Sequence, residues 1–426
     1  MYIQKVNIEN IKSIKNFEME FENPTGWHVL IGDNGSGKSG IIQAIALALI
    51  GSDEIAGIQP NWNDYLKWGE NHGTIELKIT ASENDPRIPS GKFSRTKYNS
   101  SINLKRKEKE IISLESQSPF KSIFRHNNSE EQIGWFSAGY GPFRRFTGGS
   151  EEIGKIFNNP GYSRLASHLS LFREDVALTE ISKWLMKIKF QTLEKKVKKS
   201  HLEQIKKFIN SSGFLPHGTE LKDVSSSGVS FIDGNGADVL ITQMSDGYRS
   251  ILSLTFELIR QLSKVYGDER IFKNVGKGNI VIDLPGVVLI DEVDAHLHPT
   301  WQTRIGQWFT KYFPNIQFIV TTHSPLVCRA CEKGSIWRLG APGSDNQSGE
   351  VTRTDKNRLI YGNILDAYGT EVFGKSVSIS AEGNEKRTRL GELNIKSILG
   401  EKIEDEELKE LKELKEIFPT EKLKIK

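Results

Sequence analysis

Apolar and polar residues alternate along the first part of the chain, with Ile3, Val6 and Ile8 among the apolar positions. A polar break near Asn10 separates them from a second alternating stretch that ends at Phe21. A period of two residues is typical of a strand with one buried face. The pattern predicts an N-terminal pair of strands that turns near Asn10.

Two apolar stretches follow, residues 27–31 and 39–50, and a glycine-rich segment joins them. The short stretch fits a buried strand, and the long one fits a helix that is buried on almost all sides. Another strand is predicted at 133–138. Apolar residues at helical spacings predict a small helical lobe over residues 163–210.

The later part of the chain alternates between helix and strand patterns. An amphipathic helix is predicted at 250–264, and apolar strands at 287–290 and 316–320 flank a predicted helix at 299–312. Strand, helix and strand in this order predict a parallel βαβ unit.

These elements predict an α/β protein with a mixed β-sheet lobe and an inserted helical lobe. Leucines that recur among Glu and Lys near the C-terminus predict a charged amphipathic helix. The predicted segments are a first lobe at 1–160, a helical and basic insertion at 161–225, a second lobe at 226–345 and a C-terminal extension at 346–426.

The composition fits a folded protein, because 37% of the 426 residues are hydrophobic. No apolar run reaches the roughly 20 residues that cross a bilayer, and no signal-peptide pattern opens the sequence. We therefore expect a cytoplasmic protein without membrane contact. Cys328 and Cys331 are too few for a disulfide framework and are interpreted as two thiols one helical turn apart. The net charge of +3 indicates no class of partner.

The glycine-rich segment at residues 32–39 matches the P-loop pattern G-x-x-x-x-G-K-[ST]. In such a loop, backbone N–H groups surround phosphates at the start of a helix. Lys38 is expected to meet the β- and γ-phosphates, and the hydroxyl of Ser39 is expected to bind Mg²⁺. The predicted nucleotide-binding residues are Asp33, Asn34, Gly35, Ser36, Gly37, Lys38 and Ser39.

Two carboxylates, Asp291 and Glu292, end the apolar strand at 287–290. Asp291 is the predicted Mg²⁺ ligand beside Ser39, and Glu292 is the predicted base that orients the attacking water. Buried strands that end in acidic residues also occur without this chemistry, but the upstream P-loop needs such a partner.

Two more segments place polar groups where α/β proteins bind anions. The first comprises Ser245, Asp246, Gly247, Tyr248 and Arg249. It comes just before the amphipathic helix, so it is either an anion site or a plain helix cap. The second is His323, at the end of the strand at 316–320, where ligands of parallel sheets gather. Taken alone, His323 is explained better as an ordinary structural histidine.

In this order, the four motifs resemble those of ABC-type ATPases and, within that family, of SMC-like heads. The resemblance covers residues 1–340 and implies the ABC-ATPase P-loop fold, ATP with Mg²⁺, a D-loop at Asp294 and a catalytic switch histidine at His323. It also implies that two chains enclose two ATP molecules, each bound by the P-loop of one chain and by residues 245–249 of the other. A homodimer or higher homo-oligomer is therefore expected.

Two features depart from the usual ABC pattern. Asp246 replaces a glycine of the signature, and residues 139–145 stand where the Q-loop glutamine belongs. Both features resemble the overcoming-lysogenisation-defect branch. The region at 291–339 and the tail at 417–420 look more like the ATPase subunit of Septu-type antiphage systems, which is also found beside retrons. That resemblance implies a separate HNH nuclease as partner and, beside a retron, a reverse transcriptase with its RNA–DNA product.

Other signals have simpler explanations. Residues 183–207 hold nine lysines and two glutamates, so they form either a solvated helix face or a contact to DNA. Glu382 begins a segment that resembles the start of a TOPRIM nuclease domain, but such a domain needs on the order of 100 residues. No nuclease site is therefore expected in this chain. At His296 and His298, packing or an interface is favoured over a metal site.

Three functions fit these motifs. The favoured one is an antiphage ATPase whose nucleotide-dependent dimerisation or oligomerisation controls an HNH nuclease. The alternative is a stand-alone DNA-repair or recombination-mediator ATPase that binds DNA. A transporter-type ATPase fits least well, because transporter ATPases lack an N-terminal hairpin of this kind.

Overall fold

The computed structural model forms two compact units, Met1–Tyr361 and Gly362–Lys426. Residues 346–361, which were predicted to belong to the C-terminal extension, fall in the first unit. The finer division of residues 1–345 into three segments stays a prediction. The structure describes all residues except 59–60, 84, 86–88, 91–92, 95, 108–111, 121–133, 144–161, 174–178, 195–199, 226–227, 272–279, 342–347, 364–380, 401–402 and 419–426.

An antiparallel sheet forms the outer layer of the first unit, and its strand order is β2-β1-β4-β7-β8. The predicted N-terminal strand pair is confirmed, but its turn comes later than Asn10. Strand pairing continues to Ile11 and Ile14, and the chain turns between them, where Lys12 has a positive φ of 52°. The strands are β1 (Tyr2–Ile11), β2 (Ile14–Glu20), β4 (His72–Thr80), β7 (Lys97–Arg106) and β8 (Ile112–Gln117).

The central sheet has the order β16-β15-β3-β14-β13-β9. All neighbours in it pair in parallel except β16, which is antiparallel to β15. The strand predicted at 133–138 runs instead from Ser137 to Tyr140, and residue 133 lies outside the described residues. The strands are β3 (Gly26–Gly32), β9 (Ser137–Tyr140), β13 (Gly286–Ile290), β14 (Ile316–Thr322), β15 (Ile336–Leu339) and β16 (Gly349–Glu350).

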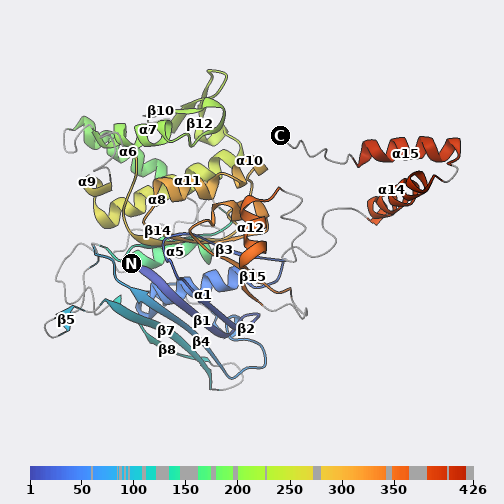
Figure 1. Ribbon diagram of the computed structural model, residues 1–426. Coiled ribbons are helices and arrows are strands. Elements are labelled where there is room, and N and C mark those ends of the chain that lie inside the picture. The colour runs from blue at the N-terminus through green and yellow to red at the C-terminus, as the bar shows by residue number, and fades with distance from the viewer. Residues whose placement is uncertain are drawn as a thin grey trace. The chain divides into compact units, whose positions relative to one another are not determined.

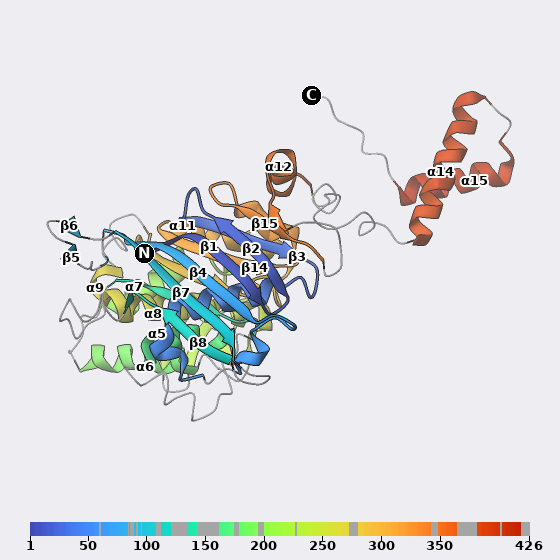
Figure 2. The ribbon, with the colours of Figure 1, turned by 90° about the horizontal axis from the view of Figure 1, so that it is seen from below.

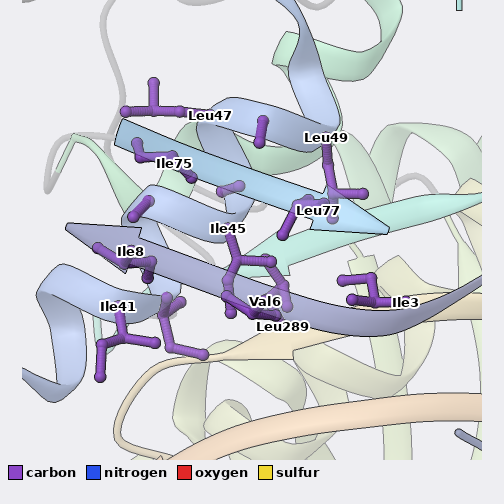
Figure 3. Packing of buried hydrophobic residues seen from close by; sticks show 14 of the residues in the cluster. Ile3, Val6, Ile8, Ile41, Ile45, Leu47, Leu49, Ile75, Leu77 and Leu289 are labelled. Atoms are coloured by element: carbon purple, nitrogen blue, oxygen red, sulfur yellow. The ribbon is translucent and has the colours of Figure 1, made fainter. Parts of the chain in front are cut away.

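Helix α1 (Lys38–Ile50) lies between the two sheets. Its residues from Ile41 onward are almost all buried, because β1 and β4 cover one side and β13 and β14 the other. Figure 3 shows Ile41 and Ile45 of this helix among side chains of β1, β4 and β13. A helix that is apolar all round is stable only in such a setting, so the sequence prediction of a buried helix is confirmed.

Helices α8 (Asp246–Tyr266) and α11 (Ile305–Tyr312) lie on the opposite side of the central sheet from α1 (Figure 1). The predicted βαβ unit is confirmed, although its helix is split into α10 (Pro299–Gln302) and α11. The predicted helical lobe contains α5 (Ser163–His168), α6 (Thr179–Leu193) and α7 (Ser200–Ser211). A small antiparallel sheet follows, made of β10 (Glu220–Ser225), β11 (Gly228–Ile232) and β12 (Asp238–Leu240).

The first unit also contains several short elements. They are α2 (Ser52–Ile55), β5 (Pro89–Ser90), β6 (Phe93–Ser94), α9 (Asp268–Ile271) and α12 (Arg353–Tyr361). Figure 2 gives the view in which the antiparallel sheet faces the reader. Together the elements confirm the predicted α/β P-loop fold with a mixed sheet and inserted helices.

The second unit contains the predicted charged helix. It pairs α14 (Ala381–Leu399) with α15 (Asp405–Ile417), and the two pack through a small core of Leu390, Leu393, Leu411 and Leu414. Nowhere in the described parts of the chain is there a helix long and apolar enough to span a bilayer.

Two buried histidines make the stability of the first unit depend on pH. In β3, His28 Nε2 donates to the carbonyl of Pro24 at 3.0 Å, so its Nδ1 accepts from the hydroxyl of Ser335 at 2.8 Å. His168 of α5 is fully buried as well. Burial lowers the pKa of each histidine from 6.5 to about 4.

We expect the free energy of unfolding to fall as the pH decreases from 6.5 toward 4. In this range the unfolded histidines bind protons and the folded ones do not, which favours the unfolded state by about 3 kcal/mol for each residue at the acidic end. Urea unfolding at several pH values measures the slope. The double variant His28→Gln/His168→Leu is expected to flatten it, whereas His72→Gln, at an exposed histidine, leaves it unchanged. An unchanged slope in the double variant would contradict the assignment.

Candidate functional site

Three of the four predicted motifs meet at one edge of the central sheet. Strands β3, β14, β13 and β9 are parallel neighbours, with Val29 paired to Val320 and Leu289 to Ile319. Their carboxyl ends therefore lie side by side. The P-loop follows β3, His323 follows β14, and Asp291 follows β13. This edge is where parallel α/β sheets bind their ligands.

The P-loop has a backbone that glycine makes possible. Gly35 and Gly37 have φ angles of 79° and 94°, in the region that other residues rarely adopt. The N-cap of α1 is Gly37, which makes no side-chain capping bond. Lys38 Nζ donates to the carbonyls of Gly32 and Asp33, each at 2.8 Å.

Lys38 also links the loop electrostatically to the carboxylates of the next strand. Burial lowers the pKa of its ammonium, and the negative charges of Asp291 and Glu292 act against that shift. The cation therefore lies within reach of the acidic groups at the end of β13. A phosphate between them would replace the carbonyl contacts of Lys38 with a charge-assisted bond.

The residues at the end of β13 are held tightly. Asp291 is 5% exposed, and its backbone N–H donates to the carbonyl of Tyr140 at 2.8 Å. Its Oδ1 accepts a 2.5 Å hydrogen bond from the hydroxyl of Thr321. Glu292 is half-buried and has a positive φ of 47°. Asp294, the predicted D-loop residue, accepts a 2.6 Å hydrogen bond from the hydroxyl of Thr322.

The donor set fits Mg²⁺. Ser39 supplies a hydroxyl in the first turn of α1. Asp291 supplies a carboxylate whose negative charge raises the pKa of Lys38, the residue before Ser39. Mg²⁺ prefers oxygen ligands, and it commonly takes only one or two of them from the protein and the rest from phosphates and water. The described residues contain no cluster of three or more His, Cys, Asp or Glu side chains that could hold a metal by themselves.

The predicted signature lies in a separate groove. Ser245 occupies the N-cap position of α8, but its exposed side chain makes no capping bond within the described structure. Asp246, which replaces a glycine, forms an ion pair with Arg249. The groove has a volume of about 930 Å³, and the residues that line it do not include the P-loop. They are Leu215, His217, Ser245, Asp246, Gly247, Tyr248, Ile251, His296, Leu297, His298, Thr300, Trp301 and Arg304.

The segment in place of the Q-loop packs closely on the helical lobe. A side chain at Gly139 would meet Leu171 at 2.3 Å, and one at Gly141 would meet the carbonyl of Ser170 at 2.0 Å. The hydroxyl of Ser170 also donates to the carbonyl of Gly139 at 3.1 Å. The contact at Gly141 is with a backbone carbonyl, so a side chain at that position would force the backbone to shift. Arg144 and Arg145 lie outside the described residues.

Several residues near the candidate site were not predicted from the sequence. Lys12, in the turn of the N-terminal hairpin, donates to Gln43 of α1, and Gln43 donates to the carbonyl of Leu171 at 2.7 Å. Burial lowers the pKa of Lys12. His217 joins the groove from a turn that carries no motif. Thr321 lies two residues before His323, but nothing in the sequence around it predicts that its hydroxyl reaches Asp291.

The two cysteines and the basic run have ordinary surroundings where they are described. Cys328 and Cys331 are buried free thiols, and burial raises the pKa of both, which makes them unreactive. In the basic run, Lys189 pairs with Asp223 at 2.8 Å. Residues 195–199, which hold four of its lysines, lie outside the described residues.

Comparison with known proteins gives matches over most of the chain. It is 28% identical over 340 residues to the Septu protein PtuA of Bacillus mycoides (strain KBAB4), a match that covers 79% of this chain and 40% of that protein. It is 26% identical over 394 residues to the Retron Ec83 probable ATPase of Escherichia coli, covering 79% of this chain and 71% of that one. The chain thus spans less than half the length of the PtuA relative. Both matches confirm the predicted resemblance.

A solved structure with a similar chain path is the Smc head domain of Pyrococcus furiosus bound to the C-terminal domain of ScpA. It is 17% identical, the match covers 87% of this chain and 100% of that one, and the TM-score is 0.48. A family model described as "AAA domain, putative AbiEii toxin, Type IV TA system" matches residues 28–329. The chain therefore belongs to this AAA-domain family.

Proposed function

We propose that this chain binds ATP with Mg²⁺ and hydrolyses it. The observation that carries the proposal is the meeting of the P-loop, the carboxylates of Asp291 and Glu292, and His323 at one edge of the central sheet. These are the parts that phosphoryl transfer to water requires: a phosphate cradle, a metal ligand, a base and a further polar group.

Each residue has a distinct role in this reaction. The N–H groups of the P-loop and the ammonium of Lys38 bind the β- and γ-phosphates. Ser39 and Asp291 would hold Mg²⁺, which when bound neutralises charge on the phosphates. Glu292 orients the attacking water and accepts its proton, and His323 donates a hydrogen bond toward the γ-phosphate.

The signature completes the site from a second chain. Ser245 is exposed at the start of a helix of 21 residues, in a groove whose lining does not include this chain's own P-loop. The positive end of that helix attracts anions, and Arg249 balances the charge of Asp246. ATP therefore joins two copies of the chain, and a homodimer or higher oligomer is the active form.

This ATPase serves antiphage defence, and its nucleotide-dependent association controls a separate HNH nuclease. The support is the similarity to a Septu protein and to a retron ATPase. Beside a retron, the further partner is a reverse transcriptase with its RNA–DNA product.

A stand-alone DNA-repair ATPase is the second candidate. The nine lysines of residues 183–207 favour it, because a run of positive charges attracts the phosphate backbone of DNA.

Two substitutions separate ATP binding from hydrolysis. Lys38→Ala removes the phosphate-binding cation, so calorimetry is expected to show ATP affinity reduced by about 10-fold or more. Glu292→Gln keeps the binding groups and removes the base, so ATP binds while turnover falls by about 100-fold or more. Lys78→Ala, at an exposed lysine of β4, is the control. Normal turnover in Glu292→Gln would remove that residue from its role.

Mixing two inactive variants tests the composite site. Lys38→Ala has a defective P-loop and an intact signature, and Ser245→Arg has the reverse. A mixed dimer contains one intact site, so ATPase activity is expected to recover when the two are refolded or co-expressed together. No recovery, with both variants folded and associated, would show that the signature does not act on the partner's nucleotide.

Co-purification tests the proposed partners. The chain, expressed from its native locus, is expected to bring down an HNH nuclease identified by mass spectrometry, and Glu292→Gln with ATP is expected to change the amount recovered. Recovery of DNA without a nuclease would favour the DNA-repair function, and the bound nucleic acid can be measured in the same samples.

A further inference from the structure

Thr321 bonds to three consecutive residues at the end of β13. Its hydroxyl donates to Asp291 Oδ1 at 2.5 Å and accepts from the backbone N–H of Glu292 at 2.7 Å. Its carbonyl accepts from the N–H of Val293 at 3.0 Å. A single buried residue on the neighbouring strand thus fixes the segment that carries both acidic groups.

The strand pairing explains why this residue reaches them. β13 and β14 are parallel and in register, with Ile290 beside Val320, so the next residue of β14 faces the chain as it leaves β13. Successive side chains of a strand point to opposite sides. Thr321 therefore bonds to Asp291, whereas Thr322 bonds to Asp294. Both threonines are 0% exposed, so water does not compete for these hydrogen bonds.

The two side-chain hydrogen bonds of Thr321 constrain the carboxylate of Asp291 and the backbone of Glu292. A hydroxyl that donates to an ionised carboxylate forms a strong hydrogen bond and holds it in one rotamer. At Glu292 the bond holds the backbone, whose φ of 47° is a conformation that a non-glycine residue keeps only when its surroundings enforce it. The direction of the Glu292 side chain depends on that backbone conformation.

We propose that Thr321 is a positioning residue for ATP hydrolysis, with its hydroxyl holding Asp291 in place as a Mg²⁺ ligand and Glu292 in place as the base. The inference rests on the proposed ATPase function. Thr321 acts through these two residues and does not itself contact the nucleotide. A methyl group in place of the hydroxyl keeps the volume and removes both side-chain bonds.

Thr321→Val and Thr321→Ser test the proposal together. We expect Thr321→Val to lower kcat by about 10-fold or more, to raise the Mg²⁺ concentration at half-maximal activity, and to change the Kd for metal-free ATP by less than about 3-fold, measured by calorimetry. Thr321→Ser keeps the hydroxyl and is expected to restore most of the activity and the Mg²⁺ dependence.

Thr255→Val is the matched control. Thr255 is a 0% exposed threonine of α8, and its hydroxyl has no hydrogen-bond partner in the described structure. This variant is expected to keep the wild-type kcat. Urea unfolding of all variants separates loss of positioning from loss of fold. If Thr321→Val is too unstable to purify, the comparison of Thr321→Ser with Thr321→Ala isolates the hydroxyl in the same assays.

The outcomes distinguish the two proposals. If the wild type hydrolyses ATP, Glu292→Gln does not, and folded Thr321→Val keeps the wild-type kcat and Mg²⁺ dependence, the role of Thr321 is wrong and the ATPase function stands. If the wild type does not hydrolyse ATP, or Glu292→Gln does so normally, the function itself is wrong and the role of Thr321 falls with it.

Discussion

Burial of α1 between two sheets is the constraint on which the site depends. The helix has no polar face from Ile41 onward, so it is stable only where β1 and β4 cover one side and β13 and β14 the other (Figure 3). Its N-terminus is thereby fixed against the carboxyl edge of the central sheet. The glycine-rich loop that follows β3 ends at that N-terminus, so packing in the core sets the position of the loop.

Register in the central sheet determines the remaining geometry. Asp291 and Thr321 are 30 residues apart, yet the pairing of β13 with β14 brings them within one hydrogen bond. The same strands carry Asp294 and His323 at their ends. A shift of one residue would turn every side chain to the other face of the sheet, so the chemistry of the site is specified by the same apolar residues that fix the pairing.

Features that depend on neighbouring residues could be predicted from the sequence. The βαβ unit and the buried α1 are each predicted from a short window of residues, and the structure confirms both. The P-loop motif is equally local, and its phosphate-binding role stays a prediction. What depends on distant contacts was not predictable: the bond from Thr321 to Asp291, the contact of Lys12 with Gln43, and the presence of His217 in the signature groove. The turn of the N-terminal hairpin was predicted near Asn10 and lies between Ile11 and Ile14. The alternation of apolar and polar residues does not show which residue takes the positive φ of a turn, here Lys12.

In the proposed reaction Glu292 is the base, so its left-handed backbone would place activity and stability in opposition at one position. Glycine would adopt a φ of 47° without strain, but it carries no carboxylate. Selection for a more stable fold and selection for turnover therefore favour different residues there. Under this proposal, we expect a relative that binds ATP without hydrolysing it to be free to carry glycine or another residue that tolerates a positive φ at this position.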